Sequence, residues 1–383
     1  MSAHAVAQAA PVGPALEKPV LFVTGHAPAY RVGGLARLHE REQIELALFG
    51  GRSKHGGAGF EQEMPFPYRH VKPHELYGLA ASGDYRAVIC PTGGRLAPLG
   101  TWRGARRARV PLLLWASLWA HPRSVAHAFT YLPLRRLYRS ADAVVTYGEH
   151  VSAYVRERGA RNVHVAPQAV DNDFWSSPAV QAPSDLNWPT QAAVRFLFVG
   201  RPQREKGLAV LDEAWRAAEL KPDQAALVLA GVDSSLTAIA PAGPRRGSDA
   251  GMYGLGRLEP DELRNVYAAS DVLVLPSIAT RTFQEPWGLV INEAMNRGLP
   301  VIASDAVGAA AGGLVRDSVN GLVVEGGDSA ALAHAIVRLA EDRQLRARLG
   351  AQGAQDVRAY SYDAWAEGFC SALADVNVSR GHW

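Results

Sequence analysis

The chain has 383 residues and carries 40 Lys and Arg against 37 Asp and Glu, so it is close to neutral for its size. This length exceeds what one hydrophobic core usually serves, which predicts two domains, and the charge balance argues against a specific nucleic-acid partner. Two cysteines are too few for a disulfide framework or a cysteine-rich metal site, and no apolar run reaches the roughly 20 residues of a membrane helix.

Residues 1–18 are rich in Ala and Pro and lack the basic start and apolar core of a signal peptide. They are predicted to be a disordered lead-in to a cytoplasmic protein. Residues 19–175 then alternate short apolar runs with longer helical patterns, which predicts a doubly wound, Rossmann-like α/β domain. Its expected strands are 20–24, 44–49, 87–90, 110–115, 143–146 and 163–166, with helices over 34–42 and 131–140.

Residues 176–192 are a linker by composition, since Ser, Pro and Asn replace the apolar runs. A second doubly wound α/β domain is predicted over 193–358, followed by a helical segment over 359–383 that we expect to pack back on the first domain. Ligands of such sheets bind beyond the carboxyl ends of strands, so a site is expected in a cleft between the domains. The strands expected here are 195–199, 226–230, 251–254, 272–275, 301–303 and 321–324.

Two glutamates eight residues apart, Glu285 and Glu293, bracket a turn that leads into a predicted helix. This spacing lets a loop carboxylate and a helical carboxylate face one ligand. Each can accept hydrogen bonds from a pair of hydroxyls, which sugar rings and riboses both offer. Between them, Pro286 and Gly288 suit a helix start, whose free N–H groups attract an anion such as a diphosphate. The segment therefore predicts a binding site for a nucleotide-sugar.

A second loop, residues 200–207, follows the first strand of the second domain and precedes an amphipathic helix. Arg201 offers a planar fork for phosphate oxygens and Lys206 a mobile charge, while Gly200 and Gly207 let the backbone approach a ligand closely. The loop lacks the Gly-Lys-Ser/Thr ending of a Walker loop. An ordinary charged loop is the alternative, and the neighbouring glutamate segment favours the phosphate site.

In the first domain, Gly33 and Gly34 close the first strand-to-helix loop, where a double glycine permits backbone N–H contact with a phosphate. A plain tight turn is the alternative. His26 in the same loop is a candidate catalytic or acceptor-orienting group, although lone loop histidines are more often polar surface residues. The sequence Asp171-Asn172-Asp173 imitates a metal-binding motif. Its distance in sequence from the phosphate loops favours a turn or helix cap, and no metal is assigned.

The stretch 101–140 combines eight arginines with interleaved aromatic residues and has no Asp or Glu. Such a mixture suits an anionic membrane surface, an acidic acceptor or a polyphosphate chain. A solvated basic face over ordinary core aromatics is the alternative. The arginines are Arg103, Arg106, Arg107, Arg109, Arg123, Arg135, Arg136 and Arg139.

Residues 196–324 resemble the retaining glycosyltransferases of family 4, which have the two-domain GT-B fold. The resemblance rests on four motifs in the second domain. They are Phe198-Val199-Gly200-Arg201 with Glu205-Lys206-Gly207, the run from Ala269 to Ser277, the Glu-X7-Glu spacing from Glu285 to Glu293, and the run from Gly298 to Ala303. Residues 33–34, 140–144 and 166–171 extend the resemblance more loosely into the first domain.

The resemblance implies roles for these residues. Arg201 and Lys206 would bind the donor diphosphate, Glu285 would face the transferred sugar, and Glu293 would hold the ribose hydroxyls. The segment 253–258 would contact the base. The remaining donor contacts would come from glycines and backbone amides at Gly33, Gly34, Gly200, Gly288, Leu289 and Val290.

One departure from the family concerns the first domain. Many members carry a histidine just after the strand that ends here at Trp115, whereas this chain has Ala116 and Ser117 there. His121 follows a few residues later, and it is a candidate acceptor or catalytic group only if the loop folds back. The catalytic assignment in the first domain is therefore open.

The resemblance implies a metal-independent transfer, with retention of anomeric configuration, from a nucleotide-sugar to a hydroxyl-bearing acceptor. The acceptor would be a glycan, a lipid-linked molecule or a small molecule, bound by the first domain, and the nucleotide-sugar is a co-substrate, so no cofactor is expected. The alternatives are a nucleotide-sugar epimerase of similar fold and a catalytically silent nucleotide-sugar-binding protein. A phosphorylase that uses pyridoxal phosphate is a weaker alternative.

Overall fold

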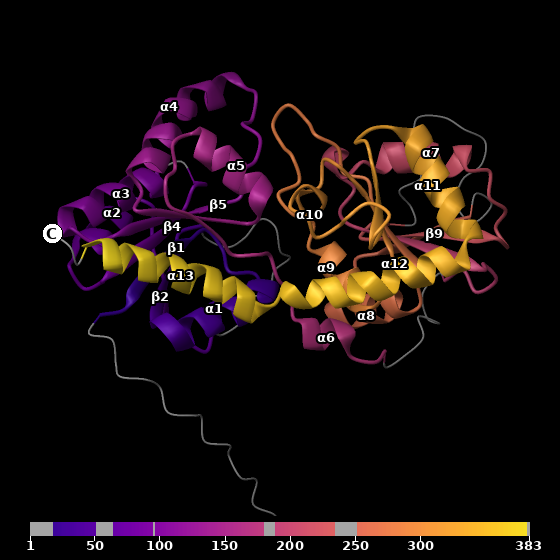
Figure 1. The fold of residues 1–383 in the computed structure, drawn as a ribbon, viewed down its shortest axis with the longest axis horizontal. Coiled ribbons are helices and arrows are strands. Elements are labelled where there is room, and N and C mark those ends of the chain that lie inside the picture. Colours follow the sequence, from indigo (N-terminus) through magenta and orange to yellow (C-terminus); the bar gives the residue numbers. More distant parts are fainter. Residues whose placement is uncertain (1–17, 51–63, 95, 180–187, 234–250, 381–383) are drawn as a thin grey trace, which may run out of the picture.

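The computed structural model describes residues 18–50, 64–94, 96–179, 188–233 and 251–380. Two sheets divide the described chain into an N-terminal and a C-terminal half, which lie side by side (Figure 1). The expected lead-in, apart from Lys18, and the central part of the expected linker lie outside the described residues.

Within the described residues, the N-terminal half contains a seven-stranded parallel sheet in the order β3-β2-β1-β4-β5-β6-β7. The apolar runs predicted its strands, apart from β3, whose three residues are all exposed and give no such signal. The strands are β1 (Val20–Thr24), β2 (Ile44–Leu48), β3 (Tyr68–His70), β4 (Ala87–Pro91), β5 (Leu112–Ala116), β6 (Ala143–Thr146) and β7 (Val163–Val165).

Helices cover both faces of this sheet, as parallel pairing requires. One core packs α1 and the distant helix α13 (Tyr362–Arg380) on one face, and a second core packs α2 to α5 on the other. The helices of this half are α1 (Ala29–Glu42), α2 (Leu76–Ala81), α3 (Ala97–Ala108), α4 (Val125–Ser140), α5 (Glu149–Glu157) and α6 (Asn172–Ser176).

The described C-terminal half contains a six-stranded parallel sheet in the order β10-β9-β8-β11-β12-β13. Its strands, all predicted to within two residues at each end, are β8 (Val194–Val199), β9 (Ala225–Ala230), β10 (Met252–Gly256), β11 (Val272–Leu275), β12 (Val301–Ser304) and β13 (Gly321–Val324). Helices α7 (Leu208–Ala217), α11 (Ser329–Glu341) and α12 (Arg343–Asp356) pack on one face. Helices α6, α8 (Pro260–Ala268) and α9 (Val290–Asn296) pack on the other.

The helices of the C-terminal half that the structure describes are α7 (Leu208–Ala217), α8 (Pro260–Ala268), α9 (Val290–Asn296), α10 (Gly308–Ala311), α11 (Ser329–Glu341) and α12 (Arg343–Asp356). Helices α12 and α13 run one after the other along the same side of the molecule (Figure 1). Helix α13 thus leaves the C-terminal half and packs on the N-terminal sheet, where Phe369 lies 5.5 Å from the ring of Phe22.

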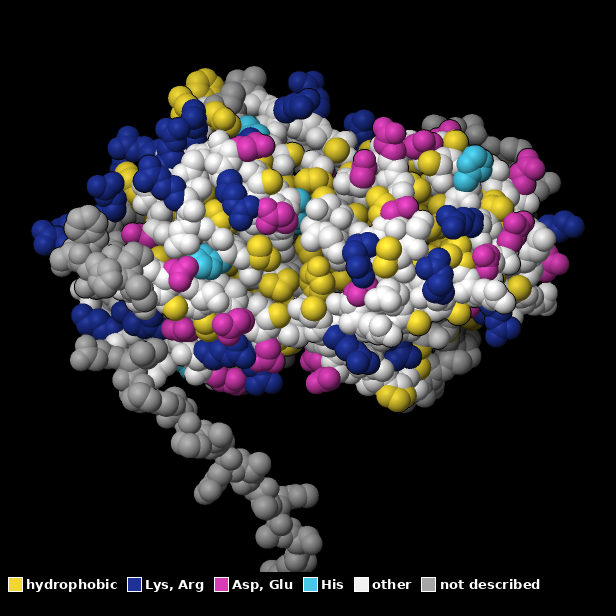
Figure 2. All heavy atoms as spheres, viewed as in Figure 1, with side chains coloured by type: hydrophobic (Ala, Val, Ile, Leu, Met, Phe, Trp, Pro, Cys, Tyr) yellow, Lys and Arg dark blue, Asp and Glu magenta, His cyan; other side chains and the backbone are white. Residues whose placement is uncertain are grey.

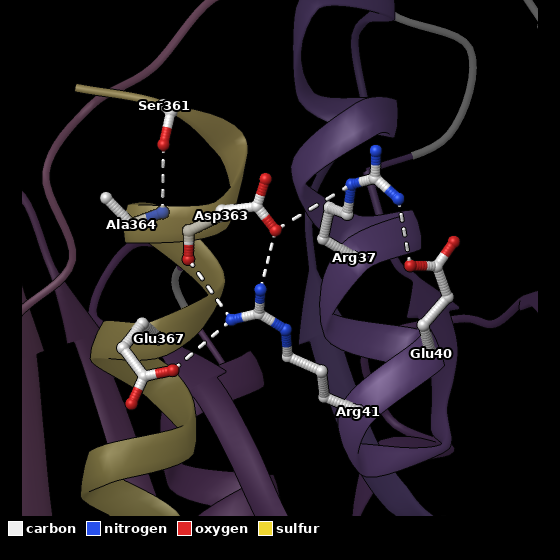
Figure 3. Close-up of polar contacts among 7 residues, drawn as sticks. All are labelled: Arg37, Glu40, Arg41, Ser361, Asp363, Ala364 and Glu367. Atoms are coloured by element: carbon white, nitrogen blue, oxygen red, sulfur yellow. Dashed lines mark hydrogen bonds and ion pairs between the residues drawn. The ribbon is translucent and has the colours of Figure 1, made fainter. Parts of the chain in front are cut away.

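Helix α13 lies close to α1 because α1 has two glycines on the facing side. A Cβ at Gly33 would lie 2.2 Å from the ring of Tyr362, and a Cβ at Gly34 would lie 3.0 Å from Trp365. Figure 3 shows the polar rim of this contact, where Arg41 donates to Asp363 at 2.6 Å. Such an exposed ion pair contributes little, so the close apolar packing carries the contact.

Each sheet has a topological switch point, where the chain order reverses between neighbouring strands. In the N-terminal sheet it lies between β1 and β4, and in the C-terminal sheet between β8 and β11. Ligands of open α/β sheets bind outside the carboxyl ends of the strands at this point. The loop 200–207 follows β8 and the loop beginning at Pro276 follows β11, so both predicted donor segments begin there.

Candidate active site

Two loops meet at the carboxyl ends of β8 and β11. The Nζ of Lys206 donates to Oε2 of Glu285 at 2.6 Å, and the hydroxyl of Ser277 donates to the same oxygen at 3.3 Å. The side chains of Lys206 and Glu285 are 20% and 10% exposed. A cation and a carboxylate separated by 79 residues in sequence are therefore held together in a partly desolvated site, where their electrostatic effect is stronger than in water.

The local sequence explains the position of Lys206. It ends a short 3-10 turn (Arg204–Lys206), and Gly207 then takes a left-handed conformation with φ of 71°. A Cβ at Gly207 would lie 1.9 Å from the carbonyl oxygen of Pro276, so only glycine permits this approach. The N–H of Ile278 also donates to the Glu205 carbonyl at 2.9 Å. These contacts fix the loop after β8 against the loop after β11.

The backbone that presents Glu285 is held by side chains from the N-terminal half. The indole N–H of Trp119 donates to the Glu285 carbonyl at 3.1 Å, and Nε2 of His150 donates to the next carbonyl, that of Pro286, at 3.1 Å. The two rings lie edge to face, with centroids 5.1 Å apart. Burial lowers the pKa of His150, which favours its neutral form. Trp119 and His150 therefore position the loop of Glu285 across the two halves.

Glu293 lies in the first turn of α9, where the hydroxyl of Tyr267 donates to its Oε2 at 2.7 Å. Burial raises the pKa of Glu293 to about 7, against the opposing effect of the Tyr267 hydrogen bond. Burial is the main cause of the raised pKa of Tyr362, at the start of α13, and the charge of Glu293 adds a smaller contribution. Glu293 therefore has a different environment from Glu285, which is paired with a cation.

The other residues predicted at the donor site lie around the same edge. Arg201 is exposed on the loop after β8, five residues before Lys206, and a Cβ at Gly231 would lie 2.6 Å from the carbonyl oxygen of Gly200. Gly288 has a φ of 97°. Helix α9 starts at Val290 with Leu289 as its N-cap, which is later than the helix start expected between Pro286 and Gly288.

The first-domain glycines occupy a different environment from the one expected. The helix predicted over 34–42 begins at Ala29, so Gly33 and Gly34 lie inside α1 and face Tyr362 and Trp365 of α13. Their observed role is close helix packing, and their contact with a donor stays a prediction. His26 is exposed after β1, at the switch point of the N-terminal sheet, with its ring against the backbone of Gly50.

His121 does not fold back toward Glu285 in the contacts that the structure shows. Its Nδ1 lies 3.3 Å from the Tyr154 hydroxyl, and its Nε2 donates to the His127 carbonyl at 3.0 Å. These partners belong to α5 and α4, and the ring lines a cavity of about 460 Å³ beside them. Trp119, two residues earlier, contacts the backbone of Glu285 instead. A catalytic or acceptor role for His121 stays a prediction.

The motif Asp171-Asn172-Asp173 provides a helix cap, as its position in the sequence predicted. Asp171 caps α6, because its side chain accepts from the N–H of Phe174 at 2.9 Å. Among the described residues, no group of three or more His, Cys, Asp and Glu side chains is arranged to hold a metal ion.

No helix in the described part of the chain is both long and apolar enough to span a membrane.

Sequence reasoning missed the residues that support the predicted ones. Ser277 stood inside a quoted motif without a role, and nothing in the local sequence around Trp119, His150 or Tyr267 points to Glu285 or Glu293. The contacts of Trp119, His150 and Tyr267 join segments that are distant along the chain, so they can be recognised only in the folded structure.

Known proteins resemble this chain in sequence. Residues 193–342 match the family described as glycosyl transferases group 1. The chain is 31% identical over 312 residues to the D-inositol 3-phosphate glycosyltransferase of Xylanimonas cellulosilytica, which covers 73% of this chain and 70% of that protein. It is 33% identical over 214 residues to the phosphatidyl-myo-inositol mannosyltransferase of Mycobacterium leprae, covering 56% of this chain and 54% of that protein.

Solved structures resemble it in fold. Sucrose-phosphate synthase from Thermosynechococcus elongatus has a TM-score of 0.71 at 20% identity, covering 94% of this chain and 100% of that chain. HepE from Anabaena, in complex with UDP and glucose, has a TM-score of 0.71 at 19% identity, covering 93% and 99%. At these identities the likeness shows the fold, which is the GT-B fold of two Rossmann-like domains.

The fold and the matched family define a glycosyltransferase, an enzyme that transfers sugars from nucleotide-sugar donors. The chain belongs to the group 1 glycosyltransferases. The GT-B fold and the glycosyltransferase class predicted from the sequence are therefore confirmed.

Proposed function

We propose that this enzyme is a family 4 glycosyltransferase that acts with retention of anomeric configuration and without a metal ion. The contact of 2.6 Å between Lys206 and Glu285 carries the proposal, because it places a cation suited to a diphosphate beside a carboxylate suited to a sugar. The Glu-X7-Glu spacing that links Glu285 to Glu293 supports the assignment to this family.

The geometry suggests how the charged groups act in turn. Before a donor binds, Lys206 is neutralised by Glu285. A bound diphosphate would compete for the ammonium group, which would leave the Glu285 carboxylate to accept a hydrogen bond from a sugar hydroxyl. As the bond from the anomeric carbon to the diphosphate breaks, negative charge grows on the departing oxygen. Lys206 and Arg201 would stabilise that charge, and one such group typically contributes about 10²–10³ in rate.

The other predicted residues would bind the remaining parts of the two substrates. Glu293 would hold the ribose hydroxyls, and backbone amides near Gly288 would face the phosphates, with the N-terminal half binding the acceptor. Two relatives are named for inositol 3-phosphate and for phosphatidyl-myo-inositol, which supports a polyol hydroxyl as the acceptor. No covalent role is assigned to either glutamate. Closure of the two halves would exclude water and limit hydrolysis of the donor.

A thermal-shift screen with UDP-, GDP-, ADP- and dTDP-sugars identifies the donor, since a ligand that binds only the folded state raises the melting temperature. NMR of the reaction with a polyol acceptor, in the presence of a chelator, should then show a product with the anomeric configuration of the donor. An inverted product, or activity restored only by added metal, would contradict the proposal. A new sugar epimer formed from donor alone would indicate an epimerase. Binding without turnover would indicate a silent binding protein.

A cytoplasmic location stays a prediction. The donor site gives no support for contact between residues 101–140 and an anionic membrane. The observations that bear on that contact come from helices α3 and α4.

A further inference from the structure

Helices α3 and α4 form a basic surface with an apolar edge, which we call the α3–α4 face. Figure 2 shows Lys and Arg side chains gathered at this end of the molecule, with hydrophobic side chains at its edge near α4. Helix α3 contributes three exposed arginines, and α4 contributes two exposed arginines and two exposed apolar residues. The face consists of Arg103, Arg106, Arg107, Phe129, Leu132, Arg136 and Arg139.

The sequence around this face is rich in arginine, and Asp142 lines a cavity together with Arg106. Residues 96–141 contain no Asp or Glu. Within the described chain, none of the five arginines of the face forms an ion pair. Arg106 from α3 and Arg136 from α4 both lie over the ring of Trp102, at 5.2 and 5.8 Å. Like charges held this close favour an anionic partner.

The apolar edge distinguishes this face from an ordinary basic surface. Phe129 is 79% exposed and Leu132 is 68% exposed. The two are three residues apart in α4, so they project from neighbouring positions on one side of the helix. Arg136 and Arg139 follow on the same side at helical spacing. Apolar and cationic side chains therefore share one stripe, as they do on helices that lie in a membrane interface.

The combination of arginines with exposed apolar side chains favours one kind of anionic partner over another. Arginines alone would serve the phosphates of a nucleic acid or of a bilayer equally well. An exposed leucine beside an exposed phenylalanine gains little from a polyphosphate chain, whereas both side chains gain by entering the boundary of lipid headgroups and acyl chains. The face lies on α3 and α4 of the N-terminal half, whereas Lys206 and Glu285 lie on loops of the C-terminal half, so a partner bound there need not block the donor site.

We propose that the α3–α4 face docks the enzyme on an anionic phospholipid bilayer. Phe129 and Leu132 enter the interface, and the arginines of α3 and α4 contact lipid phosphates. Each arginine near such a surface contributes about fivefold to partitioning, and the contribution falls with salt as the Debye length shortens. Docking is reversible, because two apolar side chains bury far less surface than a membrane-spanning helix.

Co-sedimentation of the full chain with vesicles tests the proposal. Vesicles of phosphatidylcholine with roughly one third phosphatidylglycerol should pellet the protein at about 0.1 M salt, and release it near 1 M, where the Debye length is about 3 Å. Vesicles of phosphatidylcholine alone should pellet much less. Equal pelleting by both vesicle types, or none with either, would overturn the proposal.

Two double variants separate the contributions. Arg136→Gln with Arg139→Gln should weaken binding to the anionic vesicles at least about tenfold. Arg338→Gln with Arg343→Gln removes the same charge from exposed positions of α11 and α12 and should have little effect. Phe129→Ser with Leu132→Ser should also weaken binding, whereas Val319→Ser, on an exposed loop of the C-terminal half, should not.

The variants must keep the native circular dichroism spectrum and melting temperature, which their exposed positions predict. If each double variant binds the vesicles as its control does, the face is not the docking surface. Tighter binding of a duplex oligonucleotide than of anionic vesicles, unaffected by Phe129→Ser with Leu132→Ser, would overturn the proposal in favour of a nucleic-acid site.

Discussion

At the residue scale, the account depends on one ion pair that serves two successive purposes. In the free enzyme, Lys206 and Glu285 neutralise each other at 2.6 Å in a site that is mostly closed to water. Breaking a pair of this kind by removing one partner leaves an uncompensated charge. A donor avoids that loss because it supplies an anion for the lysine and hydroxyls for the carboxylate.

The substitution Glu285→Gln should strongly reduce turnover while the fold remains intact. Glutamine can still accept from Lys206 and Ser277, but it lacks the negative charge that would balance a positively charged transition state. We expect a loss of about 10²-fold or more in kcat with a small change in melting temperature. Glu341→Gln, at the exposed end of α11, is the matched control. Wild-type activity in Glu285→Gln would remove Glu285 from the site.

Glu293 makes stability depend on pH with a defined sign. Its pKa rises from the ordinary value of 4.5 to about 7, so the folded state holds a proton that the unfolded state releases. The resulting stability is fully present below pH 4.5 and is lost as the pH rises through 7. Glu293→Gln should therefore raise the unfolding free energy by about 1–3 kcal/mol at about pH 8 and leave it nearly unchanged at about pH 4.5.

Thermal unfolding of the wild type and Glu293→Gln at both pH values is the measurement. Tyr267→Phe is a useful companion, since it removes the hydroxyl that donates to Glu293 at 2.7 Å. An equal effect of Glu293→Gln at the two pH values would show that the carboxyl is not protonated in the folded protein near neutrality.

Part of this site could be predicted because its residues lie close together in local motifs. Glu285 and Glu293 share one segment, and Arg201 and Lys206 share one loop. The contact between the two segments could be expected from neighbouring strands at a switch point. The donors that hold the Glu285 loop, Trp119 and His150, could not, because they come from the other half of the chain.

At the scale of elements, the position of Lys206 depends on a loop that only glycine can close. Gly207 combines a left-handed φ of 71° with a contact of 1.9 Å between its would-be Cβ and the Pro276 oxygen. Gly207→Ala should therefore move the loop after β8 away from β11, with a loss of stability of about 1–3 kcal/mol and a weakened donor affinity.

The matched control is Gly78→Ala in α2, where a Cβ meets nothing within 4 Å. That change should be neutral or slightly stabilising, since alanine favours helix over glycine. Urea unfolding and donor titration of both variants provide the comparison. Equal behaviour of Gly207→Ala and Gly78→Ala would show that the loop does not depend on this glycine.

The burial and packing of each element explain which elements could be predicted from the sequence. Parallel strands that are at least partly buried are mostly apolar, so twelve of the thirteen described strands were found from the sequence. Strand β3 was missed because all three of its residues are exposed. The start of α1 was misplaced because Gly33 and Gly34 resemble a turn, whereas their small size serves the approach of α13, which is more than 300 residues away.

At the scale of the whole molecule, α13 makes the N-terminal sheet dependent on the C-terminal end of the chain. Trp365 and Phe369 pack against Phe22 and Trp115 in one core. A chain ended after residue 358 would expose this face of the sheet. Each buried aromatic or large aliphatic side chain contributes about 1.5–3 kcal/mol, so the loss would be comparable with the 5–15 kcal/mol that stabilises a typical domain.

We therefore expect this truncated chain to aggregate or to bind a hydrophobic dye, and to lose the cooperative unfolding of the N-terminal half. Removing residues 381–383 alone is the control, since they follow the described bounds of α13, Tyr362–Arg380. A truncated chain that unfolds at the wild-type temperature would show that α13 is dispensable.

The central claim is that the C-terminal half binds the diphosphate of a nucleotide-sugar through Lys206 beside Glu285. The most direct measurement is calorimetric titration of the donor found by thermal shift into wild type and Lys206→Ala, with chelator present. The account predicts binding by the wild type and affinity weakened about tenfold or more in the variant, since a charged hydrogen bond is worth about 1.5–3 kcal/mol. Equal affinity in the two proteins would contradict it.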